Sequence, residues 1–131
     1  MKTVLVVVVT ALIAVSALAM HTVRAQPVGG KRTELQRHDL GVPGREVVQV
    51  RVEIGPTPIR HTHPGEEVIY VLQGSIEYQI EGKPPVTLGP GEVHFIPAGA
   101  IHSARNVGTG VAAELATYIV EKGKPLVVLV K

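Results

Sequence analysis

The sequence of 131 residues contains no cysteine and no tryptophan. Without cysteine the chain cannot form disulfide bonds, which small exported domains often use as their main source of stability. Stability must therefore come from a hydrophobic core, with a bound metal ion or association between chains as additional sources.

Aromatic residues are also scarce, at 3% of the chain. Aromatic side chains stack on single-stranded nucleic acid, and clusters of lysine and arginine bind its phosphates. After Arg24 the sequence has no basic run longer than the pair Lys31-Arg32. The formal net charge of +2 falls to zero without residues 1–25, which carry Lys2 and Arg24 and no acid. Nucleic acid is therefore excluded as an expected partner.

The long apolar run in the chain lies at its amino terminus, where only Thr and Ser interrupt residues 3–20. A short basic start, an apolar stretch and small residues before a cleavage point are typical of a secretory signal peptide. Residues 1–25 are predicted to be such a peptide, cleaved after Ala19 or Ala25, so that the protein is exported, periplasmic or secreted. The alternative is an uncleaved membrane anchor, because the run approaches the ~20 residues that span a bilayer.

The remainder of the chain is predicted to hold one domain. Residues 26–32 contain Pro27 and the pair Gly29-Gly30, which is typical of a flexible linker. The domain is expected over residues 33–131, because the 106 residues that follow residue 25 suffice for one domain but not for two.

Alternation of apolar and polar residues predicts β-strands throughout this domain. The clearest case is residues 46–54, in which one face is apolar and consists of Val48, Val50, Val52 and Ile54. Residues 75–81 alternate in the same way. Further strands are expected at residues 33–40, 67–72, 86–88, 93–96, 101–106, 111–120 and 126–130. Short strands separated by Gly and Pro turns, with no helical period after residue 25, predict an all-β fold, a small antiparallel barrel or sandwich.

Two short segments carry the side chains that suggest chemistry, residues 55–74 and residues 91–106. The candidate metal ligands in them are His61, His63, Glu67 and His102. His61 and His63 stand at strand spacing, which points both rings to the same side of a sheet. Glu67 follows a Pro-Gly turn, so its carboxylate can turn back toward the same point.

Imidazole nitrogens and a carboxylate oxygen together suit a divalent first-row transition metal, such as iron, manganese, nickel, copper or zinc. One ion of this kind is the expected cofactor, and the ligand types do not determine which metal it is. The alternative is a set of unconnected polar residues at a loop and a strand end. Two segments with glycine and proline at fixed positions favour the metal site over that alternative.

The two segments resemble the paired signatures of the cupin superfamily. They read Gly55-x5-His61-x-His63-x3-Glu67-x6-Gly74 and Gly91-x5-Pro97-x-Gly99-x2-His102-x3-Asn106. The resemblance covers the central part of the chain and implies a small antiparallel β-barrel, or jelly roll, that holds a metal inside by three histidines and one glutamate. Since Glu66 is one residue short of the family spacing, the ligand role falls to Glu67.

Within the cupins, the single-domain layout resembles the quercetin-dioxygenase-like group. This resemblance implies a metal-dependent, dioxygenase-like enzyme that acts on a small organic substrate. Glu67 is the catalytic candidate, because a weakly held carboxylate ligand could leave the metal and accept a substrate proton. Two alternatives remain, a non-catalytic barrel that binds metal or a small molecule outside the cytoplasm, and a structural barrel stabilised by its metal.

The resemblance also implies a homodimer as a partner arrangement. The apolar segment 126–130 would then lie at the interface between chains, or else form an internal strand of its own chain. His38 and His94 are interpreted as residues outside the site, His38 in a polar segment and His94 in a strand. The dispersed arginines Arg51 and Arg60 are expected to be surface charges, as is Arg105.

Overall fold

The computed structural model describes residues 30–131 of the chain. The predicted signal peptide, residues 1–25, and most of the predicted linker lie outside the described residues. The first strand begins at Lys31, two residues before the expected start of the domain. Among residues 30–131, no helix is long and apolar enough to cross a membrane.

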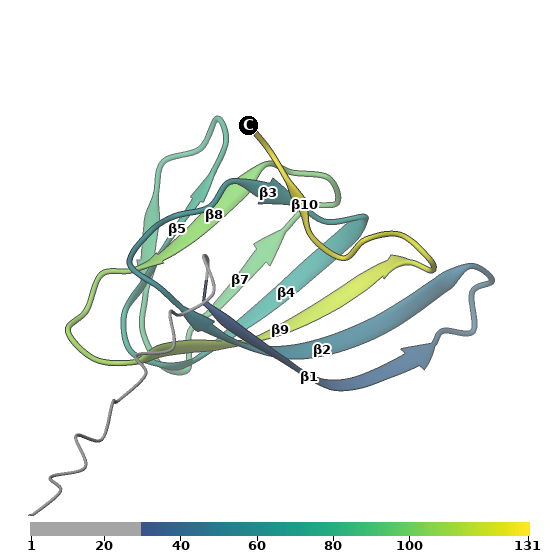
Figure 1. Ribbon diagram of the computed structural model, residues 1–131, viewed down its shortest axis with the longest axis horizontal. Coiled ribbons are helices and arrows are strands. Elements are labelled where there is room, and N and C mark those ends of the chain that lie inside the picture. Colours follow the sequence, from purple (N-terminus) through teal and green to yellow (C-terminus); the bar gives the residue numbers. More distant parts are fainter. Residues whose placement is uncertain (1–29) are drawn as a thin grey trace, which may run out of the picture.

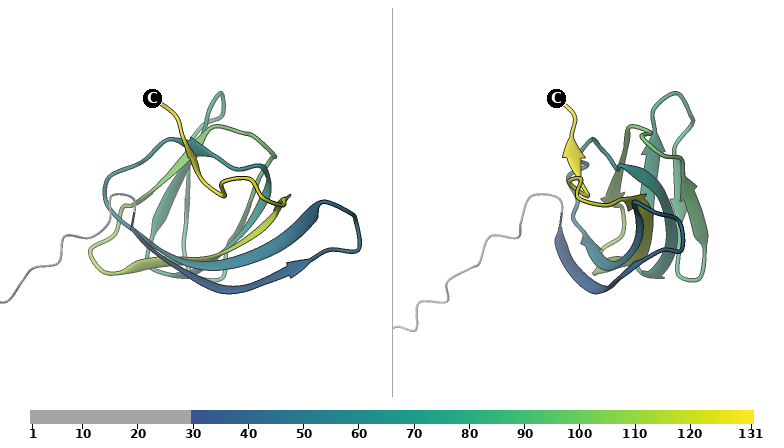
Figure 2. Two further views of the ribbon diagram at one scale, coloured as in Figure 1. Left: turned by 45° about the vertical axis from the view of Figure 1, so that its right-hand side comes forward. Right: turned by 90° about the vertical axis from the view of Figure 1, so that its right-hand side faces the viewer.

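The described residues form antiparallel strands arranged as two five-stranded sheets, as the all-β prediction requires (Figures 1 and 2). The strands are β1 (Lys31–Asp39), β2 (Arg45–Ile54), β3 (His61–Thr62), β4 (Gly65–Gln73), β5 (Ile76–Ile80), β6 (Val86–Leu88), β7 (Val93–Ile96), β8 (His102–Asn106), β9 (Ala112–Glu121) and β10 (Val128–Leu129). One sheet has the order β1-β2-β9-β4-β7 and the other the order β10-β3-β8-β5-β6. Neighbours in space are mostly distant in sequence, which is typical of a jelly roll.

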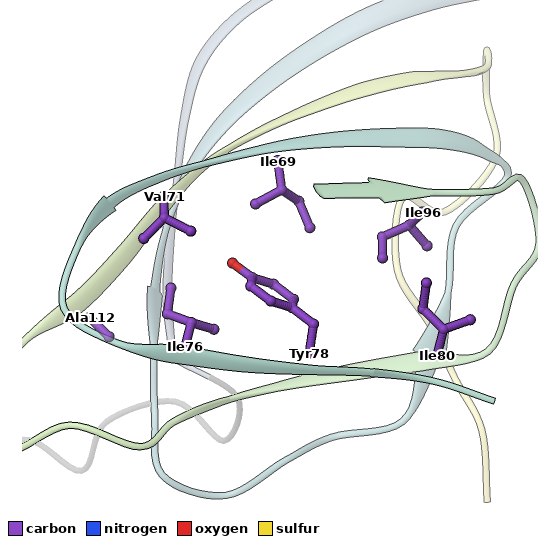
Figure 3. Packing of buried hydrophobic residues seen from close by; sticks show 7 residues of the cluster. All are labelled: Ile69, Val71, Ile76, Tyr78, Ile80, Ile96 and Ala112. Carbon is purple, nitrogen blue, oxygen red and sulfur yellow. The ribbon is translucent and has the colours of Figure 1, made fainter. Parts of the chain in front are cut away.

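The hydrophobic core lies between the two sheets. From β4, Ile69 and Val71 point toward Ile76 and Tyr78 of β5, as Figure 3 shows. Tyr78 is fully buried, and its hydroxyl group points across the core toward the opposite sheet. The core therefore contains a polar group at its centre.

The strand predicted at residues 46–54 is confirmed as β2. Val48, Val50 and Val52 are buried on the face predicted to be apolar, and they pack beside residues of β9. Alternation works here because one face of the sheet is covered by the opposite sheet while the other meets solvent.

The carboxyl-terminal segment 126–130 lies within the same chain. Strand β10 pairs with β3, and Leu126 packs against the core, whereas Val128 and Leu129 are exposed. The segment therefore pairs within its own chain but is not the buried internal strand of the second alternative, and its role at an interface between chains stays a prediction.

Gly65 opens β4 at a point where the backbone of β9 lies very close. A Cβ atom at this position would lie 2.0 Å from the carbonyl oxygen of Ile119 and 2.8 Å from Cα of Val120. Both atoms belong to the paired strand β9, so neither can move away without disturbing the β4–β9 ladder. Only glycine fits between His63 and Glu67 at this position.

We expect Gly65→Ala to lower the free energy of unfolding by about 3 kcal/mol, because the extra methyl group overpacks two backbones. Urea denaturation followed by far-UV circular dichroism measures this change. Gly41→Ala is the matched control, since a Cβ atom there meets nothing within 4 Å. Equal stability of the two variants would contradict the close approach of β4 and β9.

Candidate metal centre

The structure brings the four predicted site residues together inside the barrel. His61 of β3 lies directly opposite His102 of β8, and their ring centroids are 4.3 Å apart. His63 follows β3, and its ring lies 4.8 Å from that of His61 and 5.0 Å from that of His102. One ring nitrogen from each histidine lies within 4.8 Å of the other two. Glu67 of β4 completes the group and is buried.

Each of the three rings is held by its Nδ1 atom. The Nδ1 atoms of His61 and His102 lie 2.8 Å and 2.9 Å from the carbonyl oxygens of Ile59 and Ala100. A carbonyl oxygen only accepts hydrogen bonds, so each Nδ1 carries the proton and donates it. The proton is thereby placed away from the centre of the cluster, and the lone pair of Nε2 is directed into it.

His63 is held in the same way by a distant part of the chain. Its Nδ1 donates to the carbonyl oxygen of Leu126, at 2.6 Å. The turn that precedes β10 therefore positions a residue of the site. This link could not be predicted from the sequence, because residues 126–130 show only an apolar character.

The Nε2 atoms of His63 and His102 both point to the carboxylate of Glu67. Glu67 Oε2 lies 3.3 Å from Nε2 of His63 and 3.2 Å from Nε2 of His102. His63 Nε2 is buried and has no hydrogen-bond partner among residues 30–131. Because each ring carries its proton on Nδ1, the Nε2 atoms and the Glu67 carboxylate face one another with lone pairs and no hydrogen-bond donor between them. A bound cation would satisfy these buried lone pairs.

The protonation states fit this arrangement. Burial lowers the pKa of His61 to about 4, so its ring is neutral and able to bind a metal at neutral pH. Burial alone would raise the pKa of the Glu67 carboxyl, whereas positive charge at the neighbouring His102 and His63 positions lowers it below its ordinary value. A cation bound in the cluster acts in the same sense and favours the ionised Glu67.

Beside this cluster lies a cavity of about 40 Å³, enough for a few water molecules. Its apolar wall includes Ile54, Ile59 and Ile69. Its polar wall includes His61, Glu67 and His102, together with four residues that were not assigned to the site from the sequence, namely Arg32, Tyr78, Glu114 and Tyr118. The alternation of β9 could have revealed Glu114, which shares its face with Ala116, Tyr118 and Val120.

Glu114 is a second buried carboxyl group in the barrel. It accepts a hydrogen bond of 2.5 Å from the hydroxyl of Tyr78. Burial, together with the negative charge of Glu67, raises the pKa of Glu114 to about 8. Burial and the neighbouring Glu114 also raise the pKa of Tyr78. Both groups are therefore protonated at neutral pH.

The other residues considered in the sequence lie apart from the cluster. His38 is exposed on β1. The ring of His94 on β7 lies 5.5 Å from that of Tyr78, and burial lowers its pKa. The side chain of Asn106 bonds the backbone of residues 108 and 110, a structural role.

Residues 48–128, more than half of the chain, match the family model described as a cupin domain. The chain belongs to the cupin family. The predicted antiparallel barrel and the three-histidine cluster agree with that assignment, and the cluster is a site for a single divalent transition metal.

Similar proteins are other cupins, several of them enzymes. The dimethylsulfoniopropionate lyase DddQ of Ruegeria pomeroyi is 47% identical over 45 residues, which are 34% of this chain and 22% of the lyase. Its crystal structure superposes with a TM-score of 0.56 at 29% identity, covering 63% of this cupin and 42% of the lyase. This cupin therefore spans less than half the length of that relative.

Two further structures resemble the barrel. An oxalate oxidase in complex with the substrate analogue glycolate gives a TM-score of 0.64 at 26% identity, covering 81% of this cupin and 57% of that chain. A cupin-like protein from Thermotoga maritima gives 0.58 at 24% identity, covering 76% and 74% of the two chains. The second likeness concerns the fold alone.

Proposed function

We propose that this cupin is an enzyme in which His61, His63, Glu67 and His102 hold one divalent transition metal. Its substrate is a small organic molecule bound in the adjoining cavity. The observation that carries the proposal is the convergence of Nε2 and carboxylate lone pairs, without a donor, on a point beside that cavity. When bound, the metal supplies Lewis-acid or redox chemistry.

The chain itself contributes positioning, water exclusion and a proton acceptor. The Nδ1 bonds fix the three imidazole rings before any ligand binds, so little reorganisation is needed during reaction. The isoleucines of the cavity wall limit the water around the substrate. Glu67, as a buried carboxylate at the centre, can take a proton from a substrate in contact with it.

The reaction that we propose first is dioxygenase-like, of the kind associated with the quercetin-dioxygenase-like group. The support is the single-domain layout with three histidines and one glutamate. Oxygen-electrode measurements on metal-loaded protein, with small enols and small organic acids as probes, test this proposal. Oxygen uptake that depends on the metal and on a probe is the expected result. Turnover that proceeds equally under argon would contradict it.

A lyase reaction is the second candidate. It is favoured by the 47% identity to the dimethylsulfoniopropionate lyase, although the match covers only 34% of this chain. An elimination needs a base and an acidic carbon–hydrogen bond but no oxygen, so product formation under argon supports it. If metal-loaded protein binds probes and converts none, the non-catalytic binding barrel is the correct function.

The predicted export and the homodimer also remain proposals. Export rests on the apolar amino-terminal run of the sequence, and the homodimer on the family resemblance. Mass spectrometry of the protein from separated cell fractions would reveal cleavage after Ala19 or Ala25, and uncleaved protein in the membrane fraction would establish the anchor instead.

The role of Glu67 as both ligand and base gives a direct prediction. We expect Glu67→Gln, measured at saturating metal, to lower kcat at least about 100-fold, because the amide oxygen can still bind metal but cannot accept a proton. Glu66→Gln is the control, since the Glu66 carboxylate lies 2.8 Å from Arg45 and not in the cluster. Full turnover by a metal-loaded Glu67→Gln protein would refute the role of Glu67 as the base.

A further inference from the structure

Arg32 differs from the other arginines that the structure describes. Each of those has a glutamate carboxylate within 3.2 Å; they are Arg37, Arg45, Arg51, Arg60 and Arg105. Within residues 30–131, Arg32 forms no such ion pair, and its partner is the neutral hydroxyl of Tyr118. The one arginine that lines the cavity is therefore the one without a counter-ion in the described chain.

Strand register places Arg32 on the inner side of the barrel. It lies opposite Val52 of β2, and Val52 lies opposite Glu114 of β9. Residues directly opposite in neighbouring strands project to the same face of a sheet. Val52 and Glu114 are buried on the inner face, so Arg32 also projects toward the inside. Because β1 is an exposed edge strand (Figure 1), Arg32 lies where the cavity meets solvent.

The guanidinium group of Arg32 is held in place by one residue. Its Nη2 atom donates a hydrogen bond of 2.6 Å to the hydroxyl of Tyr118. Its central carbon lies 5.5 Å from the centroid of the Tyr118 ring, which is within the range of a cation–π contact. The ring of Tyr118 packs in turn 4.6 Å from that of His63. One tyrosine therefore joins Arg32 to the metal centre.

The acids of the cavity are engaged elsewhere. Glu67 contacts two histidines of the cluster, and Glu114 accepts the hydrogen bond of Tyr78. A guanidinium group has five N–H donors, and only one of them is used on Tyr118. The remaining donors form the planar fork that matches the two oxygens of a carboxylate.

We propose that Arg32 binds the carboxylate of a small organic acid, and that this acid is the substrate held between Arg32 and the metal centre. This inference rests on the proposed function and specifies the substrate class for the same site. Arg32 acts as a specificity-determining residue that selects an anion of this shape. The volume of the cavity, about 40 Å³, restricts the acid to a compact one.

The test compares acetate with acetamide, which has the same shape and no charge. Binding to the full, metal-loaded chain is followed by NMR titration. We expect wild-type protein to prefer acetate, and Arg32→Gln to weaken acetate binding at least about tenfold, since hydrogen bonds between charged groups contribute more than those between neutral groups. Arg32→Lys restores part of the affinity, because it keeps the charge but loses the fork.

Arg105→Gln is the matched control, because Arg105 is paired with Glu77 on the surface. It should bind acetate as wild type does. Acetate can also bind the metal directly, but that contribution is common to all variants and cancels in the comparison. Equal acetate affinity in Arg32→Gln and Arg105→Gln would overturn the inference, as would tighter binding of inorganic phosphate than of acetate.

A second variant separates anchoring from folding. Tyr118→Phe keeps the buried ring against His63 and removes only the hydroxyl that orients Arg32, so we expect a severalfold loss of acetate affinity with metal content unchanged. The failure of this inference can be distinguished from the failure of the proposed function. Acetate binding that depends on Arg32, without turnover of any probe, would support the carboxylate site and refute the enzyme. Turnover of uncharged probes that Arg32→Gln leaves unchanged would support the enzyme and refute the carboxylate site.

Discussion

Replacing His63 with alanine is expected to leave the purified protein with less than about a tenth of the metal that wild type holds. His63 is buried, and its Nε2 has no hydrogen-bond partner in the part of the chain that the structure describes. Loss of one ligand of four, in a site whose supporting contacts alone are commonly worth 10–100-fold in affinity, should weaken binding by more than about 100-fold. Elemental analysis of protein from its native compartment measures both the metal and its stoichiometry.

His38→Ala is the control for this experiment, because it also removes one histidine, but His38 is exposed on β1 and lies outside the cluster. It should retain the metal content of wild type. The wild-type protein should also melt at a lower temperature after chelation, since a ligand that binds only the folded state stabilises it. A wild-type chain that contains no metal and cannot be loaded would refute the metal centre and leave a binding barrel.

The identity of the bound metal would also redirect the proposed chemistry. Iron, manganese, nickel or copper would support a reaction with oxygen, because these ions are redox-active in sites of nitrogen and oxygen ligands. Zinc has no redox chemistry, so stoichiometric zinc would favour the lyase, a hydrolytic reaction or a structural role.

Much of the fold could be predicted from local sequence. The alternation at residues 46–54 predicts β2, because burial on one face requires an apolar residue at every second position. The candidate site could also be predicted from the sequence, because His61 and His63 are close in sequence and the Gly and Pro positions indicate the turns around them. The structure brings these residues together with His102 across the β3–β8 pair. Their role as ligands stays a prediction.

What the sequence could not supply is the pairing of distant strands. Arg32 falls within the segment predicted to be a linker, and nothing local places it opposite Val52. The carbonyl of Leu126 that fixes His63 belongs to the backbone and therefore leaves no trace in residue type. Contacts of this kind depend on which strands are neighbours, and that order follows from the whole chain.

Strand β9 places the carboxyl group of Glu114 in the buried interior, and its ionisation there makes the stability of the protein depend on pH. The pKa of Glu114 is raised from the ordinary 4.5 to about 8 by burial and by the charge of Glu67. Above pH 4.5 the unfolded chain releases this proton, while the folded chain keeps it until about pH 8. The folded state binds more protons in this window, so the free energy of unfolding falls as pH rises.

We therefore expect Glu114 to make the wild-type protein lose on the order of 1 kcal/mol of stability per pH unit between about pH 5 and pH 8. Glu114→Gln keeps the shape and an acceptor for the hydroxyl of Tyr78 but cannot ionise. Its stability relative to wild type should rise steadily across that window. Because the chain has no tryptophan, urea denaturation followed by far-UV circular dichroism at several pH values is the suitable measurement.

The groups that face Glu114 determine the size of this effect. Tyr78 donates to its carboxyl and, with the guanidinium group of Arg32, favours the ionised form, whereas burial and the charge of Glu67 oppose it. Glu81→Gln, an exposed position, should follow the wild-type dependence. If wild type and Glu114→Gln instead change in parallel between pH 5 and pH 8, then Glu114 is ionised in the folded protein. The cavity would then hold a second negative charge, which could pair with Arg32 and leave no free cation for a substrate carboxylate.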